Sequence, residues 1–410
     1  MLRTHLDIQA RFEALSTLLK NKRVLWETRP FVEIRPQWEN EFPDLANWLR
    51  ERSHSDIDRI EEDWSYLNHL EAPQLFLDWH EECNRLVHLE SFATEPSEAL
   101  SEKSLRYGIP ARKWAQIRIF VETCRAILPS NIQRVVDWCA GKGHVSRMFN
   151  LATQIETRAL EKRPDLCDIG RKLAHKQRLQ TCEFCCLDVL EDETSTHFNQ
   201  AQAGIALHAC GHLTDELFTQ AIEHQLDNVI SVPCCYHNLG GKKFHSSQSN
   251  AARESGLEFT QANLRLATAH ETVARIPIRV ARRREMAYRL GLDLLFREAT
   301  GIDTYHQQGP FPKALFDGDF KIFCETVSEE LNLPLPHEFD ADAAEIAGRK
   351  RALEARALSL VRACYRRPLE LWLILDRAMR LVEANRKVQV GLFCDARITP
   401  RNIMIVSQLA

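Results

Sequence analysis

The chain has 410 residues, of which 44% are hydrophobic and 27% are charged, and its formal net charge is −4. These proportions are those of a globular protein and exclude bulk disorder, which requires low hydrophobicity and high net charge. No apolar run approaches the roughly 20 residues that span a bilayer, and the first residues lack the apolar region of a signal peptide. We therefore expect a cytoplasmic protein with no membrane partner, whose 13 cysteines are reduced thiols.

The first hundred residues are expected to form a helical region, because apolar residues such as Leu6, Phe12 and Leu15 recur there at helical spacing. This region carries 20 acidic and 11 basic side chains, so we do not expect it to face nucleic acid on its own. Residues 101–410 carry 37 acidic and 42 basic side chains. That excess fits either a phosphate-facing patch or a solvated surface of mixed charge.

From about residue 130, short apolar runs alternate with helical segments, which predicts a parallel α/β sheet. The last two apolar runs, 388–394 and 402–407, are joined by a link too short for a parallel crossover, so they are expected to pair antiparallel. The other predicted strands are 134–138, 157–161, 183–187, 204–208 and 228–232.

The same pattern predicts the domain organisation. A helical stretch interrupts the alternation of strands and helices and is expected to be an insert. We therefore expect a helical N-terminal region (1–100), the first part of an α/β core (101–244), the helical insert (245–365) and the remainder of the core (366–410).

A glycine loop follows the first predicted strand and precedes a helix. It contains Gly141 and Gly143, which allow a sharp turn and a close approach of the backbone to a ligand. Glu161 ends the next predicted strand, 20 residues beyond Gly141, where a carboxylate can accept both hydroxyls of a ribose. The loop therefore predicts a nucleoside-containing cofactor on a Rossmann-like fold.

The acidic residues near this loop favour one cofactor. A dinucleotide loop would have a third glycine at position 146, where this chain has Ser146. Asp137 suits the cationic amino group and sulfonium of S-adenosylmethionine, and Asp188, after the third predicted strand, can accept from an adenine amino group. Three separate capping or loop acids are the alternative. The predicted cofactor-binding residues are Asp137, Cys139, Gly141, Gly143, Glu161 and Asp188.

The segment Pro233–His237 leaves the fifth predicted strand at its carboxyl end, where open α/β sheets bind ligands. Tyr236 or His237 can take a proton from a hydroxyl or a nitrogen, and a cysteine there can act as a nucleophile. Alternatively, the cysteines pack as small hydrophobes and His237 caps a turn. We place four side chains near the reacting methyl group: His208, Cys235, Tyr236 and His237.

The spacing of the cysteines and histidines does not match that of a structural metal site. Cys182 and Cys185 lie at odd spacing in a predicted strand and would point to opposite faces. The alternating His208, Cys210 and His212 and the later cysteine pair do not add a second C-x-x-C. The sequence alone therefore predicts no metal site.

Two basic segments are candidates for contact with an acceptor. An arginine-rich stretch runs from Arg275 to Arg289 and includes Arg282, and its arginines can bind RNA phosphates or remain solvated. The turn between the last two predicted strands carries Arg401 and Asn402, which we expect to face the acceptor, with a solvated hairpin tip as the alternative.

The pattern Asp137-x-Cys139-x-Gly141-x-Gly143 resembles motif I of class I S-adenosylmethionine-dependent methyltransferases. Together with Leu207–Gly211 and the Cys-Cys-Tyr-His segment, it resembles a methyltransferase-domain family that is similar to eukaryotic tRNA ribose methyltransferases. The resemblance covers about residues 105–250 and 365–410. It implies an α/β, Rossmann-like class I methyltransferase sheet of seven strands, with the last strand antiparallel, and S-adenosyl-L-methionine as the cofactor.

This resemblance implies a methyltransferase that acts on RNA, either tRNA or rRNA. His208-Ala209-Cys210 replaces the Asn/Asp-Pro-Pro-aromatic motif of amino-group methyltransferases, which argues against adenine N6 or glutamine amide chemistry. The alternatives are a protein or small-molecule acceptor, and a cofactor-binding adaptor without transfer activity.

Overall fold

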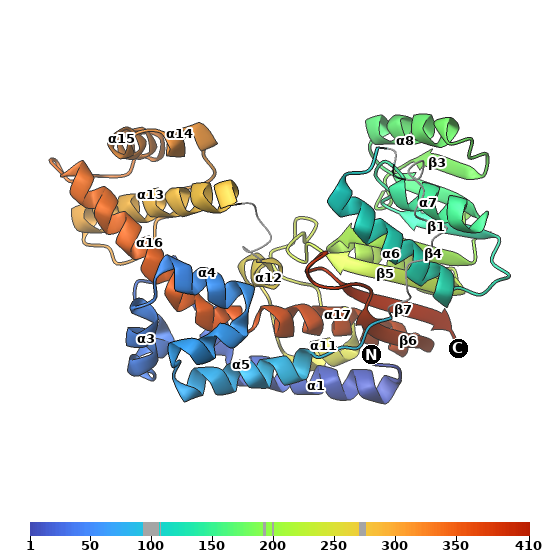
Figure 1. Cartoon of the computed structure of the whole chain (residues 1–410), viewed down its shortest axis with the longest axis horizontal. Helices are drawn as coiled ribbons and strands as arrows, with labels where there is room; N and C mark the ends of the chain where they lie inside the picture. The colour runs from blue at the N-terminus through green and yellow to red at the C-terminus, as the bar shows by residue number, and fades with distance from the viewer. Residues whose placement is uncertain (93–105, 107, 192–193, 199–200, 270–275) are drawn as a thin grey trace. The chain divides into compact units, whose positions relative to one another are not determined.

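The computed structural model describes residues 1–92, 106, 108–191, 194–198, 201–269 and 276–410 (Figure 1). It contains a seven-stranded sheet of order β3-β2-β1-β4-β5-β7-β6. The strands are β1 (Arg134–Trp138), β2 (Glu156–Glu161), β3 (Cys182–Cys186), β4 (Ala203–Cys210), β5 (Asn228–Cys234), β6 (Arg386–Leu392) and β7 (Ile403–Leu409).

The pairing of the strands confirms the predicted topology. β1 pairs in parallel with β2 and β4, β2 with β3, and β4 with β5. β7 is antiparallel to both β5 and β6. The central strands read as continuous apolar runs because helices cover both faces of the sheet. This is the Rossmann-like sheet of the class I methyltransferase fold.

The described chain divides into two compact units. The sheet unit comprises Met1–Lys20, Leu86–Thr268 and Arg367–Ala410, and the helical unit comprises Asn21–Arg85 and Ala269–Arg366. Helices α1 (His5–Asn21), α6 (Ala111–Ile127), α7 (His144–Thr153), α8 (Pro164–Lys176), α9 (Ser195–Phe198), α10 (His212–Glu223), α11 (Asn250–Ser255), α12 (Gln261–Thr268) and α17 (Arg366–Glu383) belong wholly or mainly to the sheet unit.

The helical unit contains the remaining helices. They are α2 (Arg23–Glu27), α3 (Pro43–Arg50), α4 (His54–Glu62), most of α5 (Gln74–Val87), α13 (Ile276–Thr300), α14 (Lys313–Asp317), α15 (Phe320–Leu331) and α16 (Ala341–Ala363), with 3-10 turns at Gln37–Asn40 and Trp64–Leu70. No helix among the described residues is both long and apolar enough to cross a membrane.

The sheet unit is layered. α6 and α7 lie against one face of the sheet, where Phe120 and Phe149 enter a core with Val135, Ile205 and Ile230 (Figure 1). The opposite face of the sheet meets α10. There the Nε1 of Trp138 donates a hydrogen bond to the Leu213 carbonyl at 2.8 Å.

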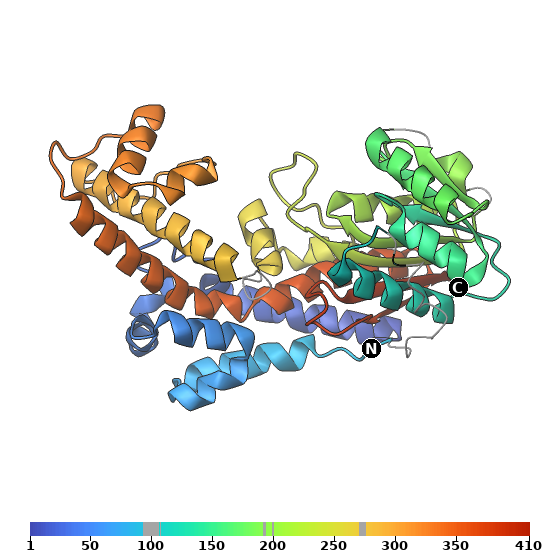
Figure 2. The same cartoon turned by 45° about the horizontal axis from the view of Figure 1, so that its top comes forward.

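The division into units differs from the domain boundaries expected at residues 100 and 245. α1 lies beside α17, where Trp372 Nε1 donates to Ser16 Oγ at 2.8 Å and the ring of Phe12 lies 5.2 Å from the Trp372 ring (Figure 1 and Figure 2). The first residues therefore pack with the sheet unit, because their apolar face completes the burial of α17.

A buried carboxylate on α17 holds the segment that follows β5. Asp376 is fully buried and accepts hydrogen bonds from His245 Nε2 at 3.0 Å, from the Gln248 amide at 3.0 Å and from the Ser249 amide at 2.8 Å. Burial raises the pKa of Asp376, but the bond from His245 and its charge outweigh this effect, so the pKa is lowered. Residues 245–249 are therefore fixed to the sheet unit, although the sequence assigned them to the insert.

Replacing Asp376 with Ala leaves several buried donors without an acceptor. We expect the free energy of unfolding to fall by about 3 kcal/mol, as measured by chemical denaturation. The matched control is Glu383→Ala on the same helix, because Glu383 is exposed and also accepts amide hydrogen bonds, from Asn250 and Ala251. Equal losses of unfolding free energy in the two variants would show that the buried network of Asp376 adds no more stability than the exposed hydrogen bonds of Glu383.

Candidate active site

The predicted site residues converge on one edge of the sheet. Glu161 ends β2, Cys139 follows β1, His208 lies near the end of β4 and Cys235 follows β5. Because these strands are parallel, their carboxyl ends meet at the same edge.

Three residues at this edge have left-handed backbone, although none is glycine. The φ angles are 57° at Cys139, 67° at His208 and 46° at Cys235. This conformation costs a non-glycine residue about 1–2 kcal/mol. Such residues concentrate at functional sites, where the surrounding structure holds them. Cys139 and Cys235 follow β1 and β5 and turn the chain out of these strands, whereas His208 lies within β4, where the register shifts between Leu207 and Cys210. Apolar periodicity does not reveal these features.

The two loop glycines have different roles. At Gly143, φ is 59° and an added Cβ would lie 2.3 Å from the Phe184 ring, so glycine is needed for packing against β3. At Gly141, φ is 60° and an added Cβ would meet nothing within 4 Å. The Gly141 amide donates to Glu161 Oε2 at 2.9 Å. The loop therefore has open space at Gly141 with a carboxylate beside it.

Asp137 lies beneath the loop. Its side chain is 2% exposed, and its Oδ2 accepts from the Ser146 amide at 3.0 Å and from the Ser146 hydroxyl at 2.5 Å. Burial raises the pKa of Asp137 to about 7. This carboxylate joins β1 to the start of α7. Ser146 thus occupies Oδ2 of Asp137, and the contact of Asp137 with a cofactor cation stays a prediction.

Asp188 remains ionised at the end of β3. Its Oδ2 forms an ion pair with Lys162 Nζ at 2.5 Å, and its Oδ1 accepts from the Leu190 amide at 3.1 Å. The Lys162 hydrogen bond lowers the pKa of Asp188 most. Glu161 thus ends β2, and Asp188 follows the neighbouring β3. Contacts of Glu161 with the ribose hydroxyls and of Asp188 with the adenine amino group of S-adenosylmethionine stay predictions.

His208 presents a free basic nitrogen. The side-chain amide nitrogen of Gln116 donates to the Ile398 carbonyl at 3.2 Å, which directs the Gln116 oxygen toward His208 Nε2, also at 3.2 Å. Nε2 therefore carries the hydrogen and Nδ1 carries the lone pair. Nδ1 is buried and has no hydrogen-bond partner among the described residues. Burial, with the charge of Lys113, lowers the pKa of His208 to about 4, so the ring is neutral.

Tyr236 does not have the properties predicted for a proton acceptor. It is 1% exposed, and its hydroxyl donates to Glu370 Oε1 at 3.2 Å. Burial and the Glu370 charge raise the pKa of Tyr236 well above its ordinary value. The phenol therefore stays protonated. His237 is less buried, and its Nδ1 lies 3.5 Å from the Thr268 hydroxyl, so a proton-accepting role for His237 stays a prediction.

The turn between β6 and β7 lies at the same edge as Tyr236. Arg401 Nη1 is 3.9 Å from Glu370 Oε1, the atom that accepts from Tyr236. Arg401 also donates to the Thr268 carbonyl and its side chain is only 13% exposed. Arg401 therefore lies near Tyr236 as predicted, and Thr268 takes one of its nitrogens, whereas its Nη1 is buried without a hydrogen-bond partner among the described residues. A contact of Arg401 with the acceptor stays a prediction.

The expectation that Asn402 faces an acceptor is not supported by its position. Asn402 is 1% exposed. Its Oδ1 accepts from Arg367 Nη2 at 2.7 Å, and its Nδ2 donates to the Cys394 carbonyl at 2.7 Å. Both ends of the amide are thus used to hold the turn, because a buried amide requires partners for both ends.

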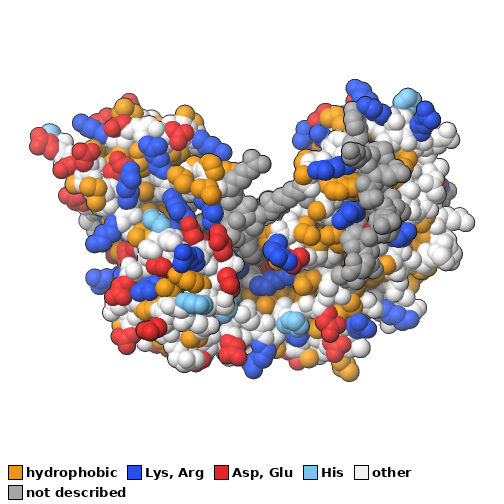
Figure 3. Space-filling model, viewed as in Figure 1, with side chains coloured by type: hydrophobic (Ala, Val, Ile, Leu, Met, Phe, Trp, Pro, Cys, Tyr) orange, Lys and Arg blue, Asp and Glu red, His pale blue; other side chains and the backbone are white. Residues whose placement is uncertain are grey.

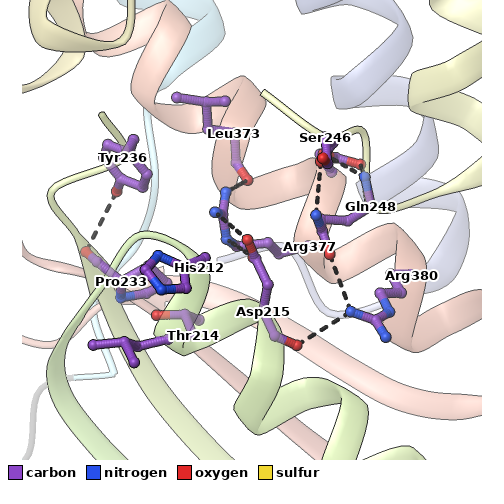
Figure 4. Close-up of polar contacts among 12 residues, drawn as sticks. His212, Thr214, Asp215, Pro233, Tyr236, Ser246, Gln248, Leu373, Arg377 and Arg380 are labelled. Atoms are coloured by element: carbon purple, nitrogen blue, oxygen red, sulfur yellow. Dashed lines mark hydrogen bonds and ion pairs between the residues drawn. The ribbon is translucent and has the colours of Figure 1, made fainter. Parts of the chain in front are cut away.

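A polar cavity that the sequence did not predict lies near this edge of the sheet. It has a volume of about 260 Å³ and lies between α10, the segment after β5 and α17 (Figure 4). Arg377 Nε is 2.8 Å from Asp215 Oδ1, and Arg380 Nη1 donates to Gln248 Oε1 at 3.0 Å. The sequence signal was a pair of arginines three positions apart in an amphipathic helix.

The basic stretch is part of a surface of mixed charge. Arg282 is exposed on α13, whereas Arg279 pairs with Glu62 at 3.2 Å and Arg283 pairs with Asp58. Arg275 lies outside the described residues. Lys and Arg side chains are interspersed with Asp and Glu side chains over the surface of the helical unit (Figure 3). RNA binding by Arg282 stays a prediction.

Comparison with known proteins identifies the domain. Residues 112–242 match a family model described as a methyltransferase domain. No curated protein sequence matches this chain. The matched segment contains the glycine loop, Glu161, His208 and the Cys-Cys-Tyr-His segment.

Several solved methyltransferase structures resemble part of the chain. A coclaurine N-methyltransferase is 13% identical with a TM-score of 0.27, over 47% of this chain and 62% of that one. A methyltransferase from Podospora anserina is 12% identical with a TM-score of 0.26, over 36% and 65%. An O-methyltransferase from a Brevibacillus brevis polyketide synthase is 14% identical with a TM-score of 0.26, over 35% and 52%. The chain thus spans less than two thirds of each. Likenesses of this extent carry no information about the acceptor.

The strand order, the open glycine loop and the matched family model agree. The chain carries a class I methyltransferase domain, and the cofactor of this domain is S-adenosylmethionine.

Replacing Gly141 with Val should abolish binding of S-adenosylmethionine, because the new side chain enters the open space at the loop. The matched control is Gly256→Val. Gly256 has φ 65° and nothing within 4 Å of an added Cβ, so both variants carry similar backbone strain. Isothermal titration calorimetry on the folded proteins measures the difference. An unchanged affinity of the Gly141 variant for S-adenosylmethionine would show that the loop is not part of the cofactor site.

Replacing Glu161 with Ala should weaken cofactor binding by about 1.5–3 kcal/mol, the usual contribution of hydrogen bonds to a charged group. Glu156→Ala is the control, because Glu156 lies at the other end of β2 and pairs with Arg134 at 2.7 Å. A loss below about 0.5 kcal/mol in calorimetry, or an equal loss in both variants, would place the ribose elsewhere.

Proposed function

We propose that this chain transfers the methyl group of S-adenosylmethionine to RNA, with tRNA or rRNA as the expected class of substrate. The observation that carries the proposal is the neutral His208 ring, whose Nδ1 lone pair lacks a partner at the edge that holds the cofactor loop. S-adenosylmethionine supplies an electrophilic methyl group on a sulfonium. The protein must align the acceptor atom and remove its proton.

The chemistry of His208 suits an acceptor that must lose a proton. A ribose hydroxyl or a base N–H is a weak nucleophile until a base takes its proton. His208 is neutral across the physiological range, because burial lowers its pKa to about 4. This agrees with the resemblance to tRNA ribose methyltransferases and with the absence of an amino-group acceptor motif after β4.

The charge of the two units indicates which surface would meet RNA. The sheet unit carries 30 basic and 27 acidic side chains, whereas the helical unit carries 23 basic and 30 acidic side chains. Favourable long-range attraction of phosphate is therefore expected at the sheet unit. Arg397, in the turn between β6 and β7, has a side chain that is 91% exposed and pairs with Asp395 at 2.9 Å. The charge balance favours the sheet unit as the main RNA-facing surface, and Arg282 of α13 stays a second candidate for contact with phosphate.

A labelling experiment tests the proposal. Purified protein is incubated with methyl-labelled S-adenosylmethionine and with total RNA, protein or small-molecule fractions from cells that lack this protein. We expect label in RNA that becomes soluble on ribonuclease treatment, and none with the Gly141→Val variant. Label in the protein or small-molecule fraction would contradict RNA as the acceptor. Absence of label in every fraction would indicate an adaptor without transfer activity.

Replacing His208 with Gln should lower kcat by about 100-fold and leave the cofactor Kd unchanged, because Gln removes the basic lone pair. His175→Gln is the control, since His175 is exposed on α8.

The pH profile gives a second test of the same residue. The active form is the unprotonated ring, and its pKa is about 4. Activity should therefore not fall as pH is lowered from about 8 to about 6. A fall in kcat with an apparent pKa near 6.5, lost in the Gln variant, would contradict the buried and neutral state of His208.

A further inference from the structure

Three thiols meet at the ends of β4 and β5. The Sγ atoms of Cys210, Cys234 and Cys235 all lie within 4.8 Å of one another, and Cys210 Sγ is 3.3 Å from Cys234 Sγ. Cys234 is buried, whereas Cys210 and Cys235 are half-buried. None of the thirteen cysteines is in a disulfide. Neither the fold nor the proposed methyl transfer explains this cluster.

Two backbone irregularities bring the thiols together. Successive residues of a strand point to opposite faces, so Cys234 and Cys235 would be separated in a regular strand. The left-handed backbone at Cys235 removes this separation. In β4, a register shift between Leu207 and Cys210 places Cys210 opposite Cys234. Bulges and left-handed residues re-aim side chains at functional sites, and each costs free energy.

We propose that Cys210, Cys234 and Cys235 form a three-thiolate site for a soft or borderline divalent metal ion, with Zn²⁺ as the expected occupant. Zn–S bonds of about 2.3 Å in a tetrahedral site place the sulfurs about 3.8 Å apart. One observed separation is 3.3 Å, and all three sulfurs lie within 4.8 Å of one another, so small side-chain movements suffice to reach this value. Three protein ligands leave a fourth position for water, as in open zinc sites.

Little in the surroundings competes with a metal ion for the sulfur atoms. Besides one another, the thiols have only weak partners, such as the His208 carbonyl, which lies 3.4 Å from Cys234 Sγ. Thiolate ligands select zinc over hard cations such as Mg²⁺ and Ca²⁺. The site is independent of the identity of the methyl acceptor.

Cobalt substitution tests the proposal without measuring activity. Co²⁺ is added to the reduced, metal-free full chain, and absorption is followed in the near-ultraviolet and visible ranges. We expect a thiolate-to-cobalt charge-transfer band and the visible bands of tetrahedral cobalt, saturating at one metal ion per chain. Serine at position 210, 234 or 235 (C210S, C234S, C235S) should each remove the charge-transfer band or greatly weaken it. Cys186→Ser is the matched control, because Cys186 is exposed at the end of β3, outside the cluster.

A protection experiment on the wild type avoids dependence on the folding of variants. Zn²⁺ should protect Cys210, Cys234 and Cys235 from iodoacetamide, as read by peptide mass spectrometry, while Cys186 reacts with or without metal. The proposal is overturned if the reduced wild type shows no cobalt band, or if C186S loses the band to the same extent. It is also overturned if Zn²⁺ leaves the alkylation of the three cysteines unchanged, or if air oxidation yields a Cys210–Cys234 disulfide in a protein that binds no metal when reduced.

Discussion

The parallel pairing of β1 with β2 and β4, and of β4 with β5, is the constraint on which the site depends. It brings residues from distant parts of the sequence to one edge of the sheet. The proposed cofactor side lies at the ends of β1 and β2, with Gly141 and Glu161, and the proposed acceptor side lies at the ends of β4 and β5, with His208 and Cys235. Left-handed backbone at Cys139 and Cys235 directs the chain out of β1 and β5, and left-handed backbone at His208 lies within β4, where its register shifts.

α17 supports the acceptor side through buried charges. Glu370 accepts from the Tyr236 hydroxyl, Asp376 accepts from the segment 245–249, and Arg377 pairs with Asp215 of α10. Each charge has a partner, as burial requires. This arrangement explains why Tyr236 and Asn402 are internal anchors, although the sequence suggested a reacting group at Tyr236 and an acceptor contact at Asn402. His208 differs from them, because its Nδ1 is buried and has no hydrogen-bond partner among the described residues.

The sequence predicted the parallel strands, the antiparallel terminal pair and the edge of the sheet that carries the candidate site, because buried parallel strands leave a clear apolar signal and the glycine loop lies between a strand and a helix. It did not predict the state of the side chains. The burial of Asp137, the hydrogen bond of Arg401 to Thr268 and the cluster of Cys210 with Cys234 and Cys235 arise from contacts between distant segments. The boundaries of the two units also differ from the expected ones, because α1 and residues 245–249 attach to α17 through long-range contacts such as those of Ser16 and Asp376.

The central claim is that a nucleoside cofactor lies over the glycine loop with its ribose on Glu161. A crystal structure of the full chain with S-adenosylhomocysteine tests this most directly. The account predicts that both ribose hydroxyls lie within hydrogen-bonding distance of the Glu161 carboxylate, with the ligand in the open space at Gly141. A ligand bound instead in the cavity of Arg377 and Arg380, with Glu161 still bonded only to the Gly141 and Arg163 amides, would contradict it.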